Sequence, residues 1–299
     1  MSSSSNSLDK VVRLAIPSKG RLREPVINLL EKAGVKILLR DENKLLSSPT
    51  SRPEIHAVFM RAEDIPTFVE VGAADIGITG LDLIIDREAD VEELLDLRIG
   101  LAEVVLAVSQ SSNIESIHDL PDEARIATRY VNLARKFLKK LAPGKRFRIM
   151  QIGGAAEIMP MLGVADAIID VRSTGITLKT HGLKVIEVLL RSSARLIANR
   201  RLPPSKRETV EKLRLMLEGV LNASKKKMIM MNVPDRFLKS VIEVIPSMSG
   251  PTIAKVEARE PMWEVYAVVD EEEVYDVVLE VKRRGARDIL ILDIEKIVP

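Results

Sequence analysis

Short apolar runs alternate with amphipathic segments from Val11 to Leu189. Runs with the length of a buried strand occur at 11–16, 56–59, 76–79, 101–108 and 167–169. Apolar residues at helical spacing follow two of these runs, at 22–33 and 65–71, and each helical pattern ends near a glycine. This alternation predicts an α/β protein with mainly parallel sheets flanked by helices.

One segment of this pattern occurs twice. Gly72–Ile78 reads GAADIGI, and Gly163–Ile169 reads GVADAII. Each copy follows a short helix and enters an apolar strand that ends at a polar turn. We therefore expect two similar α/β lobes with a ligand at the carboxyl ends of their strands. The alternative is that Gly-x-Ala-Asp recurs only because it ends helices well.

Pro203-Pro204 interrupts the pattern, and a different order of elements follows. A long helix is expected from Ser205, with Glu208 completing a capping box. The elements expected after it are a strand at 228–233, a helix at 235–245, strands at 252–256 and 263–269, a helix at 271–284 and a strand at 289–293. Asp270 and Glu273 form a second candidate capping box. The order βαββαβ is that of a ferredoxin-like domain.

These patterns predict four parts of the chain. The first lobe is expected to comprise 8–100 and 190–204, and the second lobe 101–189. A linker helix at 205–226 then leads to the small C-terminal domain at 227–299.

Composition narrows the classes of function. The chain has 45 basic and 43 acidic residues, so its net charge gives no support for a basic nucleic-acid surface. It has no cysteine and three scattered histidines, which disfavours thiol chemistry and a histidine-built metal centre. Met1–Ser7 has no apolar core for a signal peptide, and no apolar run has bilayer-spanning length. We expect a soluble cytoplasmic protein with no nucleic-acid or membrane partner.

The stretch DVRSTGITLKT, from Asp170, carries the candidate chemistry. A buried strand ends at Asp170, and Thr174, Gly175 and Thr177 turn the chain into a helix. Hydroxyls and backbone N–H groups at a helix start bind an anion such as phosphate. A carboxylate repels phosphate, so Asp170 suits a ribose diol or a magnesium ion bound to the same ligand. The alternative is an ordinary helix cap.

A longer pattern contains this stretch and resembles the signature of the ATP phosphoribosyltransferase family. It comprises Glu157, Gly163, Ala165, Ile168, Asp170, Val171, Thr174, Gly175, Thr177 and Leu178 at the spacing of that signature. The resemblance implies transfer of a 5-phosphoribosyl group from phosphoribosyl pyrophosphate to N1 of ATP, with Mg²⁺, as the first step of histidine biosynthesis. It further implies the long form of the enzyme, with two lobes like a periplasmic binding protein and a ferredoxin-like regulatory domain. Dimers assembling into hexamers, with histidine as feedback inhibitor, belong to the same expectation.

The resemblance also assigns roles to individual residues. The catalytic group would be Asp170, Thr174, Gly175 and Thr177. The substrate-binding group would be Lys19, Gly20, Arg21, Arg61, Thr79, Gly80, Asp82, Thr128, Arg129, Glu157, Asp166, Arg172, Ser173 and Ile176. The histidine site would include Asn232, Met248, Gly250, Thr252 and Ile291. No general base is assigned, since N1 of adenine carries a free lone pair and pyrophosphate is a good leaving group.

Several of these residues also fit simpler interpretations. Lys19 and Arg21 suit a polyphosphate at a strand end, but a solvated basic turn has the same composition. Arg129 suits a phosphate or an interlobe salt bridge. Glu157 and Asp166 either contact ligand or brace the loop, and Asn232 and Thr252 are also ordinary turn residues.

Two rival functions fit parts of the pattern. Prephenate dehydratases join similar lobes to a ferredoxin-like domain and carry an element like Thr128-Arg129-Tyr130. That match is short, and a dehydratase does not need a ribose-phosphate cradle. A ligand-binding protein or effector-binding regulator is the second rival. The absence of a signal peptide and of a basic helix-turn-helix segment disfavours it.

Overall fold

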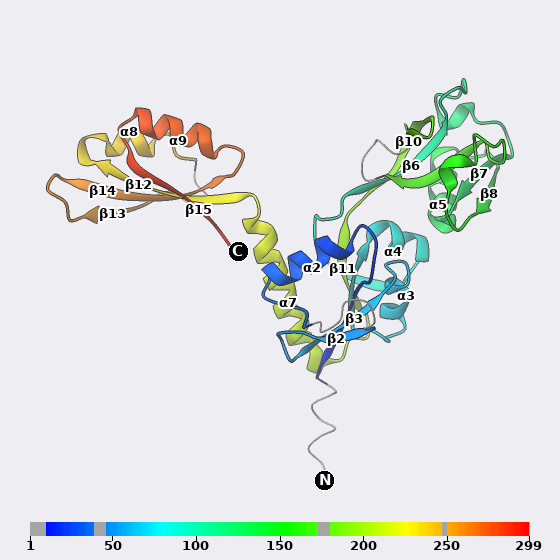
Figure 1. Cartoon of the computed structure of the whole chain (residues 1–299), viewed down its shortest axis with the longest axis horizontal. Helices are drawn as coiled ribbons and strands as arrows, with labels where there is room; N and C mark the ends of the chain where they lie inside the picture. The colour runs from blue at the N-terminus through cyan, green and yellow to red at the C-terminus, as the bar shows by residue number, and fades with distance from the viewer. Residues whose placement is uncertain (1–9, 39–45, 173–179, 247–249, 299) are drawn as a thin grey trace, which may run out of the picture. The chain divides into compact units, whose positions relative to one another are not determined.

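The computed structural model describes residues 10–38, 46–172, 180–246 and 250–298 of the chain. The chain divides into two compact units, Met1–Arg214 and Leu215–Pro299 (Figure 1). No helix in the described part is both long and apolar enough to cross a membrane.

The first sheet has the strand order β2-β3-β1-β4-β11-β5. Its strands are β1 (Val12–Pro17), β2 (Ser47–Pro49), β3 (Ile55–Met60), β4 (Ile76–Gly80), β5 (Val91–Asp96) and β11 (Ala194–Asn199). Helix α2 (Arg23–Lys32) follows β1, α3 (Ile65–Glu70) follows β3, and α4 (Leu81–Arg87) follows β4. Every residue of β4 is buried, which explains why its apolar run lacks the alternation of a half-exposed strand.

The second sheet has the strand order β10-β6-β9-β7-β8. Its strands are β6 (Ala102–Ser109), β7 (Ala124–Thr128), β8 (Phe147–Gln151), β9 (Ala167–Arg172) and β10 (Leu183–Ser192), and α5 (Val131–Leu141) follows β7. Its apolar core gathers residues of β6, β7, β9 and α5 around the ring of Tyr130. Because Ser192 of β10 still pairs with Ala102, the lobe boundary expected at residue 190 falls inside a strand.

The two sheets share one topology. The order β3-β1-β4-β11-β5 in the first matches β8-β7-β9-β6-β10 in the second. In each, one strand pairs in parallel with both neighbours: β1 with β3 and β4, and β7 with β8 and β9. The next strand, β11 or β6, arrives from the other sheet and pairs antiparallel. The expectation of mainly parallel sheets is therefore wrong: both sheets are mixed, because each contains a strand that crosses between them.

Helix α7 (Pro204–Ala223) begins in the first unit and ends in the second. It starts at Pro204, where the missing N–H costs no helical hydrogen bond. Ser205 therefore lies within the first turn, and the expected capping box with Glu208 is wrong. Glu208 instead pairs with Lys212 one turn along.

The C-terminal unit is an antiparallel sheet with two helices. Its elements are β12 (Lys226–Pro234), α8 (Leu238–Ile242), β13 (Thr252–Val256), β14 (Met262–Asp270), α9 (Val274–Arg283) and β15 (Arg287–Asp293). The strand order β13-β14-β12-β15, with antiparallel pairs throughout, confirms the ferredoxin-like prediction. The second capping box is wrong, because β14 extends through Asp270 and Glu273 makes no side-chain cap at the start of α9.

Candidate active site

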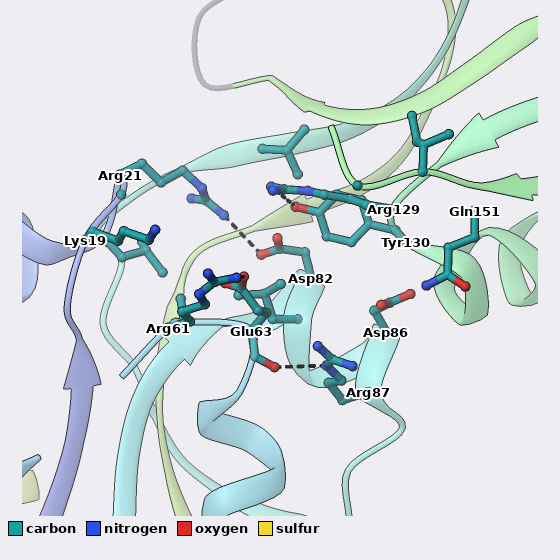
Figure 2. Close-up of a pocket in the computed structure, with 17 residues that line it drawn as sticks. Lys19, Arg21, Arg61, Glu63, Asp82, Asp86, Arg87, Arg129, Tyr130 and Gln151 are labelled. Atoms are coloured by element: carbon teal, nitrogen blue, oxygen red, sulfur yellow. Dashed lines mark hydrogen bonds and ion pairs between the residues drawn. The ribbon is translucent and has the colours of Figure 1, made fainter. Parts of the chain in front are cut away.

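The carboxyl ends of the parallel strands of both sheets meet at a cavity of about 570 Å³ (Figure 2). Residues after β1, β3 and β4 line it from the first sheet: Lys19, Gly20, Arg21, Leu22, Arg61, Ala62, Glu63, Asp82, Leu83, Asp86 and Arg87. Residues of β8 and β9, and residues after β7 and β8, line it from the second: Arg129, Tyr130, Gln151, Ile152, Gly153 and Val171. Strand ends at which successive connections diverge are the usual ligand site of such folds.

Positive side chains outnumber negative ones around this cavity. Arg21 donates to the carboxylate of Asp82 at 3.1 Å and to the carbonyl of Gly100. Among the described residues, no carboxylate lies within 4.0 Å of Lys19 or Arg129. Two cations without carboxylate partners in one cavity favour a ligand with several negative charges.

Asp82, at the start of α4, is almost completely buried beneath these cations, with 1% of its surface exposed. Its Oδ1 accepts hydrogen bonds from Arg21 and, at 2.5 Å, from the hydroxyl of Ser192. Its Oδ2 is buried and has no hydrogen-bond partner in the described part of the chain. The preceding Thr79 is buried and donates to the carbonyl of Ala62 at 2.7 Å.

Arg129 and Tyr130 follow β7 on the opposite side of the cavity. The guanidinium of Arg129 lies 4.9 Å from the centroid of the Tyr130 ring and donates to its hydroxyl oxygen at 2.7 Å. The backbone N–H of Tyr130 donates to the hydroxyl of Thr128, which is buried. Burial, and next the charge of Asp82, raise the pKa of Tyr130 well above its ordinary value.

Asp86 of α4 accepts hydrogen bonds from the first turn of α5 and so links the two lobes. Its Oδ1 accepts the backbone N–H groups of Asn132 at 3.1 Å and Leu133 at 3.2 Å. The side-chain amide of Asn132 donates to the carbonyl of Asp86 at 2.9 Å. An acidic side chain from the first sheet therefore caps a helix of the second.

Asp170 lies in β9 close to the cavity and to Glu157. Its Oδ1 accepts the N–H of Val171 at 2.7 Å. Burial raises the pKa of Asp170; the N–H of Val171 and the charge of Arg129 lower it, and the charge of Glu157 raises it further. The predicted phosphate loop, comprising Ser173, Thr174, Gly175, Ile176 and Thr177, lies outside the described residues.

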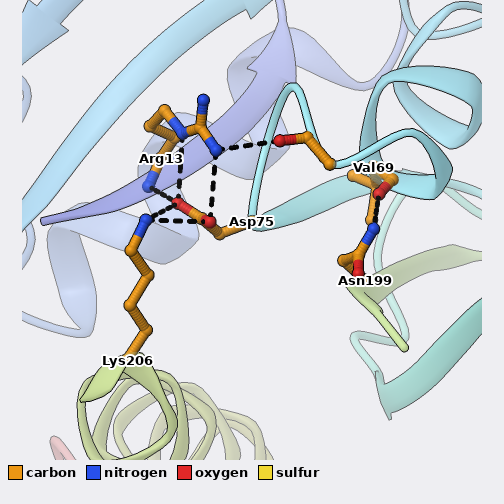
Figure 3. Close-up of polar contacts among 6 residues, drawn as sticks. Arg13, Val69, Asp75, Asn199 and Lys206 are labelled. Atoms are coloured by element: carbon orange, nitrogen blue, oxygen red, sulfur yellow. Dashed lines mark hydrogen bonds and ion pairs between the residues drawn. The ribbon is translucent and has the colours of Figure 1, made fainter. Parts of the chain in front are cut away.

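Seven of the predicted residues that the structure describes are not among those that line the cavity: Thr79, Gly80, Thr128, Glu157, Asp166, Asp170 and Arg172. Asp166 precedes β9, at the opposite end of the strand from Arg172, and pairs with Arg125 of β7 at 2.8 Å. Asp75 does the same in the first sheet: it pairs with Arg13 of β1 and also accepts two hydrogen bonds from Lys206 (Figure 3). The repeated Gly-x-Ala-Asp is thus a structural element of both lobes.

Arg172, at the end of β9, is also engaged elsewhere. It donates twice to Glu103 of β6, at 2.7 and 2.9 Å. Arg191 of β10 contacts the same carboxylate. This ion-pair network fixes the strand end immediately before the predicted phosphate loop.

Several residues that line the cavity were not predicted from the sequence. These are Glu63, Asp86, Arg87, Gln151, Ile152 and Gly153. Gln151 ends β8 and the next two follow it, where an apolar stretch leads into Gly153-Gly154. A strand followed by two glycines indicates a loop at a strand end, and this pattern could have predicted these residues from the sequence.

Part of the predicted histidine site gathers on one face of the C-terminal sheet. Asn232 pairs with Glu264 and Thr252 with Tyr266; since Glu264 and Tyr266 are two residues apart on one strand, all four share a face. Ile291 pairs with Ile229, which is buried under the helices, and so lies on the other face. Gly250 precedes β13, and Met248 lies outside the described residues.

Comparison with known proteins identifies the family. A family model described as "HisG: ATP phosphoribosyltransferase" matches residues 61–219, and one described as "HisG, C-terminal domain" matches residues 223–296. The chain belongs to the ATP phosphoribosyltransferase family. It is therefore an enzyme of histidine biosynthesis with the additional C-terminal domain.

Relatives that match along nearly the whole chain belong to the same family. The chain is 49% identical to the ATP phosphoribosyltransferase of Ignicoccus hospitalis, covering 96% of this chain and 100% of the relative. It is 48% identical to that of Sulfurisphaera tokodaii, with the same coverage. Among solved structures, a chain of the "ATP phosphoribosyl transferase (HisG:HisZ) complex from Thermotoga maritima" is 30% identical with a TM-score of 0.59, covering 70% of this chain and 99% of that chain.

Proposed function

We propose that the cavity between the two sheets binds phosphoribosyl pyrophosphate and ATP. The phosphoribosyl group is transferred to ATP within this cavity. One observation supports this proposal most directly. The strand ends of both sheets bring Lys19 and Arg129, two cations without carboxylate partners in the described part of the chain, to the same cavity. These are the groups that a pyrophosphate and a triphosphate require.

The chemistry depends on alignment and charge. The lone pair on N1 of adenine attacks C1 of the ribose, and the bond from C1 to pyrophosphate breaks, so that pyrophosphate leaves with the bonding electrons. Positive charge passes to the adenine ring. No residue has to remove a proton for this step, and the protein contributes by holding N1 in line with C1 and by neutralising the leaving group.

Individual residues fit these tasks. Lys19, Gly20, Arg21 and Arg61 on one side and Arg129 on the other would contact phosphate oxygens. The hydroxyls of Thr174 and Thr177 with the backbone at Gly175 would hold the 5-phosphate. Asp170, with Glu157 beside it, would accept hydrogen bonds from the ribose hydroxyls. Thr79 and Gly80 end β4, shortly before Asp82, and Thr128 ends β7, directly before Arg129.

The donor set also fits Mg²⁺. Mg²⁺ prefers oxygen ligands and keeps several waters or substrate phosphates. Asp170 offers Oδ2, for which the described residues provide no partner, and the neighbouring Glu157 adds a second carboxylate. No cluster of three possible protein ligands occurs among the described residues, which suits an ion held largely by the substrate's phosphates. Bound there, Mg²⁺ would neutralise charge on the leaving pyrophosphate.

We also propose that the C-terminal unit makes the enzyme sensitive to histidine in a homo-oligomer working in the cytoplasm. Asn232 and Thr252 share one face of its sheet with the carboxylate of Glu264. Amide, hydroxyl and carboxylate groups suit the charged ends of an amino acid. Inhibition would arise because histidine binds one arrangement of the subunits more tightly than another.

The test is release of pyrophosphate from ATP, phosphoribosyl pyrophosphate and Mg²⁺, with each omitted in turn and pyrophosphatase removing the product. Turnover that requires both substrates and falls with histidine supports both proposals. The Asn232→Ala variant should keep its turnover and lose at least about tenfold in histidine sensitivity, equivalent to one lost hydrogen bond to a charged group. Equal inhibition of the unaltered enzyme and the Asn232→Ala variant by histidine would exclude Asn232 from the histidine site.

A further inference from the structure

Helix α4 of the first lobe faces the amino end of α5 in the second. Asp82 and Asp86 lie one turn apart on α4 and so share a face of that helix. Asp86 already bonds the first turn of α5 through Asn132 and Leu133. Tyr130 occupies the residue immediately before α5. The contact made by Asp86 therefore brings Asp82 to the neighbourhood of Tyr130.

Asp82 and Tyr130 have complementary unused hydrogen-bonding groups. Oδ2 of Asp82 is buried without a donor in the described part of the chain. The hydroxyl oxygen of Tyr130 accepts from Arg129, but its own O–H has no acceptor among the described residues. Both side chains are at most 2% exposed, so water does not readily serve either group. Figure 2 shows the carboxylate of Asp82 facing the hydroxyl end of Tyr130.

We propose that Tyr130 donates its hydroxyl proton to Oδ2 of Asp82 when the two lobes close on their substrates. The bond completes a chain that runs from Arg21 through Asp82 and Tyr130 to Arg129. Tyr130 and Asp82 act as positioning residues, because each holds one of the arginines that line the cavity. The high pKa of Tyr130, raised by burial and then by the charge of Asp82, keeps the O–H proton in place for this bond.

Asp82 also links this chain to the segments that connect the lobes. Ser192, which bonds Oδ1 of Asp82, is the last residue of β10 before the chain returns to the first sheet. Gly100, whose carbonyl accepts from Arg21, lies on the other connection, between β5 and β6. Movement of either connection is therefore transmitted to Arg21. The arrangement aligns the two arginines only when the lobes reach their closed position.

The proposal rests on the phosphoribosyl transfer activity and predicts a specific kinetic pattern. The closed substrate complex and the transition state both contain this bond, and the bond aligns the arginines for the chemical step. Its loss therefore lowers kcat/KM, with part of the loss in kcat and part as a rise in KM. We expect about a tenfold loss for Tyr130→Phe, which deletes the hydroxyl and keeps the ring in its apolar core.

The experiment is a double-mutant cycle in the full-length enzyme with Tyr130→Phe, Asp82→Asn and both together. Turnover of the unaltered enzyme is measured first, so failure of the activity itself is seen separately. If the two groups bond, adding Tyr130→Phe to the Asp82→Asn enzyme lowers kcat/KM by less than about threefold. The same substitution in the unaltered enzyme lowers it by more. Tyr275→Phe, on an exposed tyrosine of α9, is the matched control and should leave kcat unchanged.

A binding measurement supplies a readout independent of turnover. The chain has three tyrosines, so the ultraviolet difference spectrum on adding both substrates reports a change in tyrosine hydrogen bonding. The signal should disappear in Tyr130→Phe and persist in Tyr275→Phe. Single-variant losses that multiply in the double variant, or an intact signal in Tyr130→Phe, would overturn the proposal. A large loss in Asp82→Asn with none in Tyr130→Phe would do so as well, by assigning Oδ2 to a substrate group.

Discussion

Asp75 and Asp166 occupy equivalent places in the two lobes but differ in burial. Each accepts hydrogen bonds from the backbone N–H and the side chain of an arginine, Arg13 of β1 or Arg125 of β7. The Asp75 side chain is 5% exposed and that of Asp166 31%. Asp75 also accepts two hydrogen bonds from Lys206 at the start of α7, which is why a buried carboxylate is tolerated there.

The Lys206→Met variant should lower the free energy of unfolding by about 1.5 to 3 kcal/mol, since it removes a buried charge-assisted pair while Arg13 still compensates Asp75. Burial raises the pKa of Asp75, but the hydrogen bonds from Arg13 and Lys206 outweigh it and lower the pKa below 3.8. The stabilisation by Asp75 is thus present above pH 3.8 and lost as the pH falls through the lowered pKa. Without Lys206 that loss begins at higher pH.

Denaturant unfolding at several pH values measures this effect, with Lys212→Met as the matched control on the same helix. Lys212 pairs with Glu208 on the surface, where an ion pair contributes at most about 0.5 kcal/mol. Equal losses in the two variants would show that burial adds nothing to the pair of Lys206 and Asp75.

At the scale of elements, the junction of β4 and α4 sets the position of Asp82. Gly80 ends β4 and lies at the N-cap of α4 in an extended conformation open to any residue. Space is the constraint: a Cβ on Gly80 would lie 2.3 Å from Oδ1 of Asp82 and 3.4 Å from the guanidinium of Arg21. The close approach of the backbone lets a short helix present a buried carboxylate to an arginine.

Gly80→Ala should therefore displace Asp82, lower stability by about 1 to 3 kcal/mol and reduce kcat/KM. Steady-state kinetics and thermal unfolding measure the two effects. Gly154→Ala is the control, since a Cβ there meets no atom within 4 Å, and its stability should change by less than about 0.5 kcal/mol. An unaltered Gly80→Ala enzyme would mean that Asp82 can move without consequence.

At the scale of the whole molecule, each unit has an apolar core of its own. The C-terminal core includes Ile229, Val265 and Val281, all fully buried, and it is formed entirely by residues after 214. The core around Tyr130 belongs to the first unit. Separate cores allow separate unfolding transitions, so the molecule need not behave as a single cooperative unit.

Ile229→Ala should lower the stability of the C-terminal unit by about 2 to 5 kcal/mol and its transition by at least about 8 °C. Calorimetry should show a second transition, from the first unit, at its original temperature. Leu133→Ala, in the core around Tyr130, is the reciprocal variant and should move the other transition. Movement of both transitions by either variant would show that the units unfold together.

Local pattern determined much of the fold. The strand predicted at 252–256 has those bounds in β13. The order of elements from 228 to 293 predicted the ferredoxin-like unit, because each element buries one periodic face. The signature around Asp170 predicted the family that the comparisons show. These features depend on residues close together in sequence, whose spacing the sequence displays directly.

Tertiary structure decided what depends on distant segments. The antiparallel entry of β11 and β6 made the sheets mixed, and no local pattern records which strand crosses. The sequence left open whether Asp166 contacts ligand or braces the loop, and strand pairing places it beside Arg125. The sequence also placed Arg21 and Arg129 at strand ends, but left open that Arg21 donates to the buried carboxylate of Asp82 and Arg129 to the hydroxyl of Tyr130. Hydrophobic periodicity depends on residues that are close along the chain, so the sequence displays it. An ion pair between distant segments forms only after the strands that carry them have paired.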